Sequence, residues 1–402
     1  MTPGRLIFVN RVYWPSEAAS AQLLDELTRA LVQQGHEVIV LTAKQANTLE
    51  REQHGGVAVH RLGHASGGER RSLLQRAFRG LVFNLRATRA VTALARPGDT
   101  CVVLTDPPLL GVGVTWAARR RGARVAQWGH DLYPEVALAL CPSRILRGLL
   151  RLLFPLRDWS WRQSAACAVL GSDMRARCAS RGVATPLPIV TNWALHRGSV
   201  PDGTRVRREW SLQGRFVLMY SGNFGRVHAF ESLLDLAGRL QHREDIVFVM
   251  VGDGPRRAAV ETAVQERGLG NVIWRPAQPR ERLAETLAAA DLHLISLRDG
   301  CEGLVWPSKF YGIAAAGRPM LYLGPAAAEV GRLIRQHGLG YAGDHTSAAA
   351  AADFVVRLAN EPGAADAHRR NVQQFHRTLP GLPAAAAFWS ELHRSTPSQA
   401  AA

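Results

Sequence analysis

The chain alternates short apolar runs with longer amphipathic stretches, and this alternation constrains its fold more than any other feature. The apolar runs LIFVN (6–10) and HEVIVLT (36–42) flank EAASAQLLDELTRALVQQG (17–35), whose apolar residues recur at helical spacing. This order predicts a strand, a helix and a second strand. Strands joined through helices by short connections pair in parallel with right-handed crossovers. We therefore expect an α/β fold built on doubly wound parallel sheets.

The same alternation continues, stops once and starts again. In the first half, further strands are expected at 101–105, 124–128, 166–172 and 188–193, and a helix at 109–122. In the second half, strands are expected at 216–222, 245–254, 271–276, 291–297 and 318–324. Between the halves, the polar stretch 196–214 is rich in Gly and Arg and has weak apolar periodicity, which is typical of a linker.

A chain of 402 residues is too long for one ordinary core and suits two domains. We predict an N-terminal domain over 1–195, the linker over 196–214 and a C-terminal domain over 215–380. The last segment, 381–402, is expected to form a helix near 383–395, a candidate for packing back on the N-terminal domain, and then a frayed tail. Open α/β sheets bind ligands at the carboxyl ends of their strands, so two such domains facing across a cleft predict a site at those ends.

Composition excludes several classes of protein. The five cysteines form no CxxC pair and no zinc-like spacing with His, which is typical of reduced thiols in a reducing compartment. The N-terminus lacks the features of a signal peptide, and no apolar stretch reaches the roughly 18 residues that a membrane span needs. P-loop and HExxH patterns are also absent. We expect a cytoplasmic protein, soluble or peripheral on the inner face of the membrane, that needs no metal or cofactor.

The net charge of +16 comes almost entirely from arginine, because Lys44 and Lys309 are the only lysines. A basic surface favours anionic partners: nucleic acid, acidic lipid or phosphorylated small molecules. A compositional bias toward arginine, without any special partner, would produce the same charge. Helix-turn-helix, RNP-like and zinc patterns are absent, so nucleic acid is not expected as a partner.

Two Gly-containing junctions follow expected strands in the second half. In YSGNFGRVH (220–228), glycines allow a tight turn, and Arg226 and His228 add charge beside helix amides that suit a phosphate. In VGDGP (251–255), Asp253 is placed to accept a hydrogen bond from a base or ribose. The alternatives are a plain strand-to-helix turn at the first junction and a helix cap at the second.

The third junction is RDGCEGLVWPSKF (298–310). Ser308 is the expected N-cap of the next helix, and Lys309 lies in its first turn. A cation at that end opposes the helix dipole unless an anion lies nearby, which points to a phosphate. Glu302 lies on the same loop, within reach of a hydroxyl group. The alternative for Lys309 is a solvated charge at a helix start.

Strand ends of the first half carry a second group of candidates. QWGHDLYPE (127–135) places His130 and Asp131 just past a strand, as a general base or a hydroxyl-orienting pair, or as a pair that caps a turn. Asp106 precedes two prolines that exclude helix at that point. Ser16, with Glu17 beside it, is the expected cap of the first helix.

The motifs together resemble those of family 4 glycosyltransferases, retaining enzymes with the two-Rossmann GT-B fold that use nucleotide-activated sugars. The resemblance is strongest to the bacterial branch that builds O-antigen, capsule or colanic-acid units. The motifs that carry it run through the whole chain and are GHEVIVLT, DPPLL, GHDLYPE, TNW, YSGNFG, VGDGP and PSKFYGIAAAGRP. YSGNFG and PSKFYGIAAAGRP carry the most weight.

This resemblance implies a role for each candidate. The diphosphate of the donor, with a UDP-sugar favoured, would contact Gly222, Asn223, Gly225, Arg226, His228, Ser308 and Lys309. Gly252, Asp253 and Gly254 would lie near the base, and Trp306 belongs to the same donor-binding set. Glu302, His130 and Asp131 would act at the transferred sugar, and Ser16, Glu17 and Asp106 would face the acceptor. The diphosphate would leave under stabilisation by amides and cationic side chains rather than by a metal.

Two positions depart from the wider family. The second of its paired glutamates, which usually binds ribose, falls on Gly312, so the ribose contact must come from elsewhere or from the backbone. The Arg and Lys that many relatives place after the first junction are not both present. Arg226 and His228 are the candidates there, and Lys309 is placed to supply the missing charge.

The segment 141–166 mixes arginines with Leu, Phe and Trp. If helical, it has the composition of an interfacial segment, which would suit an anionic membrane surface and a lipid-linked saccharide acceptor. The alternative is a core helix with solvated arginines. Two rival functions stay open from the residues: a GT-B sugar-nucleotide epimerase, and, more distantly, a basic nucleic-acid-binding protein.

Overall fold

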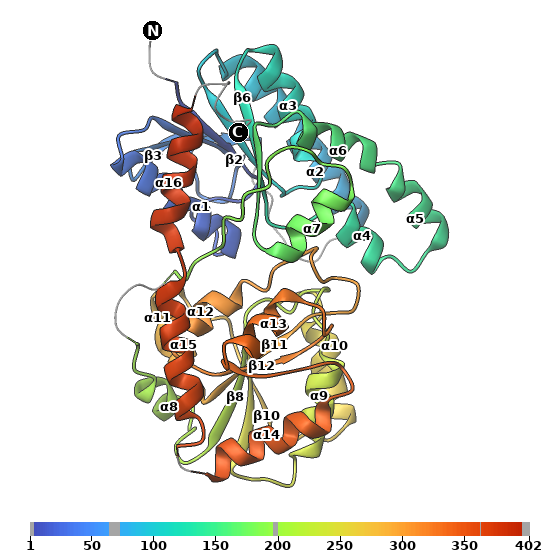
Figure 1. Cartoon of the computed structure of the whole chain (residues 1–402), viewed down its shortest axis with the longest axis vertical. Coiled ribbons are helices and arrows are strands. Elements are labelled where there is room, and N and C mark those ends of the chain that lie inside the picture. The colour runs from blue at the N-terminus through green and yellow to red at the C-terminus, as the bar shows by residue number, and fades with distance from the viewer. Residues whose placement is uncertain (1–3, 64–72, 196–199, 362, 396–402) are drawn as a thin grey trace. The chain divides into compact units, whose positions relative to one another are not determined.

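The computed structural model describes residues 4–63, 73–195, 200–361 and 363–395. Contacts divide the chain into two compact units. Unit 1 comprises 1–192, 303–305 and 380–402, and unit 2 comprises 193–302 and 306–379. Each unit is a parallel sheet with helices packed on it (Figure 1). The predicted α/β architecture of two doubly wound domains is confirmed.

Unit 1 contains a seven-stranded sheet in the order β3-β4-β2-β1-β5-β6-β7. Its strands are β1 (Leu6–Val9), β2 (Val38–Ala43), β3 (Arg51–His54), β4 (Val57–Leu62), β5 (Thr100–Leu104), β6 (Arg124–Gly129) and β7 (Ala166–Val169). All pairs are parallel except β3 with β4. Its helices are α1 (Ala19–Gln33), α2 (Leu73–Leu94), α3 (Leu110–Arg120), α4 (Glu135–Leu140), α5 (Arg144–Arg151), α6 (Phe154–Arg162), α7 (Ser172–Ser180) and α16 (Gly381–Arg394).

Unit 2 contains a six-stranded, all-parallel sheet in the order β10-β9-β8-β11-β12-β13. Its strands are β8 (Phe216–Ser221), β9 (Ile246–Val251), β10 (Val272–Arg275), β11 (Leu292–Ser296), β12 (Met320–Leu323) and β13 (Gly340–Gly343). Its helices are α8 (Thr204–Glu209), α9 (Glu231–Arg239), α10 (Arg257–Glu266), α11 (Arg280–Ala288), α12 (Lys309–Ala315), α13 (Glu329–Gln336), α14 (Ala348–Asn360) and α15 (Asp366–Thr378).

The apolar spacing of each helix determines which face it buries. On α1, Leu24, Leu27 and Leu31 are fully buried, at spacings of three and four residues. The C-terminal helix α16 lies beside α1 in unit 1 (Figure 1), and its Trp389 ring centroid lies 6.3 Å from that of Phe8 on β1. The tail beyond 395 lies outside the described residues.

Two expected features differ from the structure. No strand forms at 188–193, where Ile189 makes one isolated bridge with Val169. Pro186 and Pro188 lack the amide hydrogens that a continuous ladder needs.

The predicted linker is the second difference. Residues 196–199 lie outside the described residues, but the part from 200 onward belongs to unit 2 and contains α8. Val206, Trp210 and Leu212 are buried there against residues of β8 and β9. Most residues between these three apolar side chains are polar, so the composition of the stretch does not indicate a helix.

Each sheet has a point where the strand order reverses. In unit 1, β1 lies between β2 and β5, and in unit 2, β8 lies between β9 and β11. The crevice beyond the strand ends at such a reversal is where open α/β sheets bind ligands. The candidate residues are therefore best assessed at the ends of β1, β5 and β6 in unit 1, and of β8, β9 and β11 in unit 2.

Candidate functional site

The loops that follow β8 and β9 pack against each other through their backbones. Gly222, Gly252 and Gly254 all have positive φ angles, of 136°, 123° and 151°. A Cβ at Gly252 would lie 2.2 Å from the carbonyl oxygen of Gly222, and a Cβ at Gly254 would lie 2.3 Å from Asn223 Oδ1. Only glycine satisfies both the angles and the space. The two junctions thus form one surface that is lined by main-chain groups.

Lys309, the first residue of α12, points toward this surface. Its Nζ lies 3.6 Å from the centroid of the Tyr220 ring, and a Cβ at Gly222 would lie 4.0 Å from it. The Nζ is buried and has no hydrogen-bond partner among the described residues. Burial lowers the pKa of Lys309 well below its usual value. A buried lysine amine without a hydrogen-bond partner among the described residues is the feature of this surface that most favours an anionic ligand, because an anion would stabilise its charged form.

His228 lies beside the same lysine, in the loop between β8 and α9. Its Nδ1 is 2.7 Å from the carbonyl oxygen of Ser296, at the end of β11. Burial, and then the charge of Lys309, lowers the pKa of His228 to about 3. His228 is therefore a neutral imidazole whose second nitrogen remains for a ligand, rather than a second cation beside the lysine.

The remaining donor-side candidates have different surroundings. Asn223 and Arg226 are exposed, whereas Gly225 is buried. Glu302 and Trp306 are half-buried, in the loop that follows β11. Asp253 Oδ1 accepts a hydrogen bond of 2.7 Å from the amide of Gly254, so this carboxylate stabilises its own turn.

One detail of the expected helix starts differs from the structure. Ser308 occupies the N-cap position of α12, but its side chain makes no capping hydrogen bond. Helix α9 begins at Glu231, and the amide of its N-cap residue Phe230 donates to the Glu231 carboxylate. A phosphate contact with the amides of α9 from Glu231 onward stays a prediction.

In unit 1, an ion pair lies at the reversal of strand order. Arg11, just past β1, donates to Asp106, just past β5, with an Nη2–Oδ1 distance of 2.9 Å. Glu17 is exposed, and Ser16 Oγ accepts a bond from the amide of Ala18. Helix α1 begins at Ala19, two residues later than expected, so Ser16 stabilises the turn before the helix rather than its first turn.

His130 and Asp131 follow β6, and both are half-buried. Their amides donate to Thr105 Oγ1 at 3.3 and 3.2 Å, which fixes the chain at the end of β5. The buried His130 Nε2 has no hydrogen-bond partner among the described residues. Burial lowers the pKa of His130 to about 4. Burial, followed by the charge of Asp106, raises the pKa of Asp131 to about 6.

Three residues at these strand ends were absent from the candidates. Tyr220 lies under Lys309, and its hydroxyl donates to the Asn223 carbonyl at 2.8 Å. Thr105 anchors the His130 loop, and Asn10, fully buried at the end of β1, has an Oδ1 without a hydrogen-bond partner among the described residues. A polar residue that ends an apolar run, as in LIFVN and CVVLT, is the sequence signal that would have found the last two.

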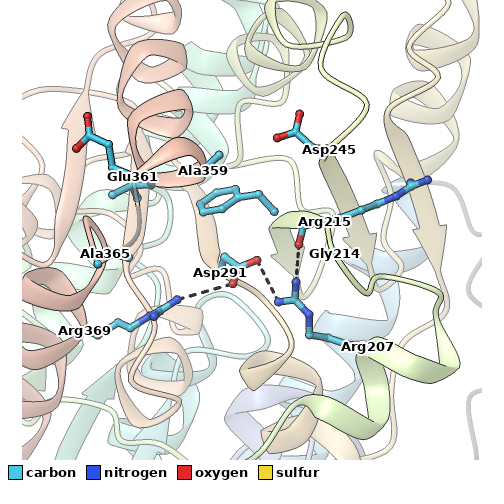
Figure 2. Close-up of a pocket in the computed structure, with 12 residues that line it drawn as sticks. Arg207, Gly214, Arg215, Asp245, Asp291, Ala359, Glu361, Ala365 and Arg369 are labelled. Carbon is cyan, nitrogen blue, oxygen red and sulfur yellow. Dashed lines mark hydrogen bonds and ion pairs between the residues drawn. The ribbon is translucent and has the colours of Figure 1, made fainter.

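A cavity of about 310 Å³ lies at the opposite edge of the unit 2 sheet (Figure 2). Its lining includes residues at or just before the starts of β8, β9 and β11. Asp291 pairs there with Arg207 at 3.0 Å and with Arg369 at 3.8 Å. This carboxylate joins α8 and α15 to the start of β11. Because the cavity lies at the amino ends of the strands, it is separate from the surface around Lys309.

In the described part of the chain, no three His, Cys, Asp or Glu side chains converge as a metal centre would require. Among the described helices, none combines the length and apolarity that crossing a bilayer requires.

Family models account for both units. Residues 20–193 match the model described as "Glycosyl transferase 4-like domain", and residues 204–374 match "Glycosyl transferases group 1". The chain is a glycosyltransferase. The two matches lie in tandem along the transferase. The alternative of a sugar-nucleotide epimerase is not favoured by these matches.

Curated relatives agree with this assignment. The transferase is 29% identical over 278 residues to the probable glycosyltransferase WbjE of Pseudomonas aeruginosa, which covers 67% of each chain. It is 34% identical over 172 residues to WcaI of Escherichia coli K12, a putative colanic acid biosynthesis glycosyl transferase, over 41% of this chain and 42% of that protein.

Solved structures share the fold of the transferase. Sucrose-phosphate synthase of Thermosynechococcus elongatus superposes with a TM-score of 0.76 at 18% identity, over 97% of this chain and 98% of that one. Anabaena HepE in complex with UDP-glucose superposes with a TM-score of 0.69 at 13% identity, over 96% and 98%. At such identities the likeness concerns the GT-B fold alone.

Proposed function

We propose that the transferase moves a hexose or N-acetylhexosamine from a nucleoside diphosphate donor, with a UDP-sugar favoured, to a saccharide acceptor in cell-surface polysaccharide biosynthesis. The configuration at the anomeric carbon is retained, and the acceptor is lipid-linked. The observation that carries this proposal is the buried, unpartnered Nζ of Lys309 beside the glycine surface of β8 and β9. Two similar proteins support the pathway and the nucleotide: WcaI is a putative colanic acid biosynthesis glycosyl transferase, and the HepE structure contains UDP-glucose.

The diphosphate is the part of the donor that suits Lys309. When the glycosidic bond breaks, negative charge accumulates on the leaving diphosphate, and a cation in a buried setting stabilises that charge strongly. Gly222 and Gly252 have positive φ angles that favour glycine, which has no Cβ. Main-chain groups can therefore reach the phosphate oxygens. Arg226 is exposed on the same loop, which allows it to approach the outer oxygens of the diphosphate.

The acceptor and the transferred sugar are assigned to the strand ends of unit 1. His130 Nε2 and Asn10 Oδ1 are buried polar atoms without partners among the described residues, and both follow strands near the reversal of strand order. Such atoms suit the hydroxyl groups of a sugar. With its pKa lowered to about 4, His130 is neutral near pH 7 and is free to accept or donate a hydrogen bond.

Donor choice is tested by a thermal-shift screen of UDP-, GDP- and dTDP-sugars. A donor that binds the folded state raises the melting temperature in proportion to the logarithm of its concentration over its dissociation constant. We expect UDP-sugars to give the largest shift, and no shift with any of the three nucleotides would contradict the proposal. The anomeric configuration is then determined by NMR of the product, where inversion would contradict the retaining mechanism.

A lipid-linked acceptor requires access to a membrane, and α5 offers a surface for it. Helix α5 has no buried residue, whereas α6, later in the segment 141–166, buries Arg157, Asp158, Ser160 and Trp161. Ile145, Leu149 and Leu152 are 81%, 57% and 70% exposed, and Arg144 and Arg147 are exposed on the same short helix. Exposed apolar side chains interleaved with arginines suit an anionic lipid surface.

Vesicle flotation tests this surface. We expect the protein to float with vesicles that contain anionic phosphatidylglycerol and not with vesicles of phosphatidylcholine alone. Combining Ile145→Ser with Leu149→Ser should abolish flotation. Leu49→Ser is the matched control, since Leu49 is also exposed, by 67%, but lies outside α5. Equal flotation of the double variant and the wild type would contradict the role of α5.

A further inference from the structure

The segment from Gly129 to Glu135 carries His130 and Asp131 and joins β6 to α4. Its early amides donate to Thr105, and its middle is held by a bond of 2.8 Å from the Leu132 amide to the Leu304 carbonyl and by a bridge between Asp131 and Val305. Both ends of the segment also contact helix α6. Through these contacts α6 affects where His130 and Asp131 lie, which the sequence of α6 alone does not suggest.

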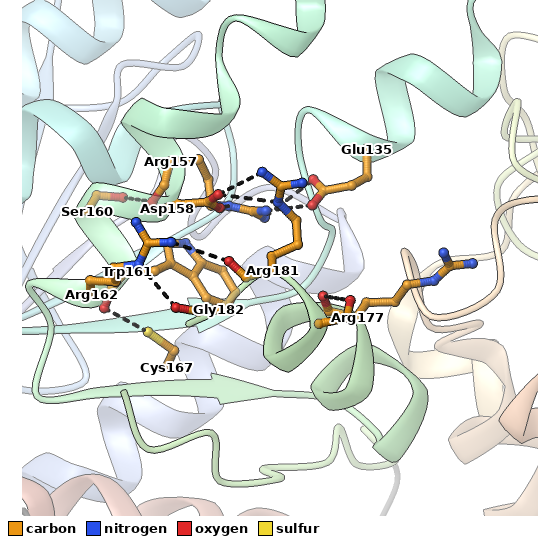
Figure 3. A network of polar contacts seen from close by, with 11 residues as sticks. Glu135, Arg157, Asp158, Ser160, Trp161, Arg162, Cys167, Arg177, Arg181 and Gly182 are labelled. Carbon is orange, nitrogen blue, oxygen red and sulfur yellow. Dashed lines mark hydrogen bonds and ion pairs between the residues drawn. The ribbon is translucent and has the colours of Figure 1, made fainter. Parts of the chain in front are cut away.

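At the far end, Glu135 is bound by Arg157 of α6 (Figure 3). Arg157 Nη2 donates to Glu135 Oε1 at 2.5 Å and Nη1 donates to Oε2 at 3.3 Å, so the guanidinium and the carboxylate form a bidentate salt bridge. Arg157 is 4% exposed. Glu135 is the first residue of α4, so this pair fixes the start of that helix against α6.

At the near end, Trp161 of α6 packs against Gly129. A Cβ at Gly129 would lie 3.0 Å from Trp161 Cη2, which is closer than ordinary van der Waals contact. Arg157 and Trp161 are four residues apart, on one face of α6, and the guanidinium lies 5.4 Å from the Trp161 ring centroid. One helical face thus contacts both the residue before His130 and the residue that ends the segment.

The charges around Arg157 are balanced. Asp158 accepts a bond of 2.8 Å from Arg157 Nε and another of 2.8 Å from Arg181 Nη2, so two arginines face two carboxylates. Burial by itself lowers the pKa of Arg157, but Glu135 and Asp158 outweigh that effect, and the net pKa is raised. Arg157 is therefore permanently charged.

A buried ion pair of this kind adds little to stability, because desolvation of the charges offsets their attraction. The pair does fix the relative orientation of the two side chains, because a bidentate salt bridge between a guanidinium and a carboxylate has one preferred geometry.

We propose that Arg157 is a positioning residue for sugar transfer: through Glu135 it fixes the segment that presents His130 and Asp131, without touching the substrate. This inference rests on the proposed role of His130 and Asp131 at the transferred sugar. A displacement of about 1 Å in such a segment can cost on the order of 100-fold in rate. The binding of the donor, which is assigned to unit 2, does not depend on it.

The test compares Arg157→Lys with Arg181→Lys. Lysine keeps the charge at position 157 but cannot form a bidentate salt bridge with Glu135. We expect kcat to fall about 100-fold while the donor dissociation constant changes less than about twofold. Arg181→Lys is the matched control, because Arg181 binds Asp158 and not Glu135. It should retain kcat. Equal loss in the two variants, or no loss in Arg157→Lys, would overturn the proposal.

A second variant guards against misfolding of the first. Glu135→Gln keeps the shape of the side chain and removes its charge, and it should lower kcat in the same direction. If the two residues act through one link, the double variant Arg157→Lys with Glu135→Gln should be no slower than the slower single variant. Fully additive losses would overturn the link.

An NMR measurement separates this proposal from the proposed function. Histidine labelled on its ring, with the His130 signal assigned by its loss in His130→Ala, reports the position of the imidazole without any substrate. Arg157→Lys should shift this signal and Arg181→Lys should leave it unchanged; the reverse pattern would overturn the proposal. If His130→Ala retains full kcat, the role of His130 fails, while the signal still decides whether Arg157 positions the segment.

Discussion

The strand ends of unit 2 and of unit 1 are built in different ways on the same topology. In unit 2 the surface consists mainly of backbone, where a Cβ at Gly252 would lie 2.2 Å from the Gly222 oxygen, and the buried Lys309 Nζ has no hydrogen-bond partner among the described residues. In unit 1 the surface consists of side chains: His130, Asp131 and an ion pair between neighbouring strands.

This difference bears on the proposed tasks of the two surfaces. In the proposed function, the backbone surface of unit 2 and Lys309 hold the diphosphate, and variation is limited at Gly252 and Gly254, where a Cβ would lie 2.2 and 2.3 Å from atoms of the loop after β8. A surface of side chains can change its hydroxyl contacts one residue at a time. We therefore expect substitutions in unit 2 to affect stability and donor affinity, and substitutions in unit 1 to affect turnover and pH dependence.

The largest effect is expected from Gly252→Ala. Its φ of 123° is unfavourable for alanine, and the new Cβ would meet the backbone of the neighbouring loop. We expect a loss of about 3 kcal/mol in the free energy of unfolding, measured by urea denaturation, together with loss of donor binding. Gly270→Ala is the control, because no atom lies within 4 Å of its added Cβ. Equal stability of the two variants would contradict the expectation that the backbone surface of unit 2 does not tolerate a Cβ.

The next effect is expected from Lys309→Ala. Removal of a charged hydrogen-bond donor costs about 1.5 to 3 kcal/mol, so the donor dissociation constant should rise about 10- to 100-fold. Calorimetric titration with a UDP-sugar measures it. Lys44→Ala is the matched control, since Lys44 lies in unit 1 and pairs with Glu50 at 3.5 Å. Unchanged donor affinity in Lys309→Ala would contradict the assignment of the diphosphate to this surface.

A pH-dependent effect is expected from Asp131→Asn. The folded-state pKa of Asp131 is raised from 3.8 to about 6, so its contribution to stability is present below pH 4 and is lost as the pH rises through 6. The variant should therefore gain stability relative to the wild type between pH 4 and pH 8, in urea denaturation at each pH.

His130 acts in the opposite direction over part of this range. Its pKa is lowered from 6.5 to about 4, so its contribution is present above pH 6.5 and is lost as the pH falls to 4. Because both proteins retain His130, this contribution cancels in the difference between wild type and variant. A difference that does not vary with pH would show that Asp131 is not held in its protonated form.

The smallest expected effect is proton uptake on donor binding. The pKa of Lys309 is lowered in the free protein, and a bound diphosphate would raise it again. Calorimetric titrations in buffers of different ionisation enthalpy should show uptake of a fraction of a proton at mildly alkaline pH. Lys309→Arg should lack this uptake, because arginine stays charged in both states. Uptake that persists in Lys309→Arg would assign the proton to another group.

The local pattern predicted most of the fold because it marks buried strands strongly. Strands β8, β9 and β11 each lie within one residue or a few of the expected ranges. Two elements that were not anticipated are weakly patterned: β3 is a polar edge strand of sequence REQH, and β13 is the glycine-rich edge strand GYAG. Such strands depend on pairing with a neighbour more than on their own side chains, so local periodicity gives little indication of them. Strand β4 was also missed, although its buried and half-buried residues alternate.

The candidate site shows the same division. Glycine at 222 and 252 and lysine at 309 follow from motifs, since local turns and a rare residue type are visible in sequence. The Tyr220 ring beneath the Lys309 Nζ, and the Thr105 hydroxyl that holds the His130 amide, come from other strands or other loops. Their functional roles, like those of the motif residues, stay predictions that the experiments above test.

The sequence by itself determined the alternation of strands and helices, the two-domain division and the glycine junctions, because these depend on the apolar period and on the backbone freedom of single residues. Only the tertiary structure decided that the Lys309 Nζ is buried without a hydrogen-bond partner among the described residues, and that Arg157 contacts Glu135 while Trp161 contacts Gly129. The physical reason is that burial and charge pairing depend on distances between residues far apart in the chain, and the fold sets those distances.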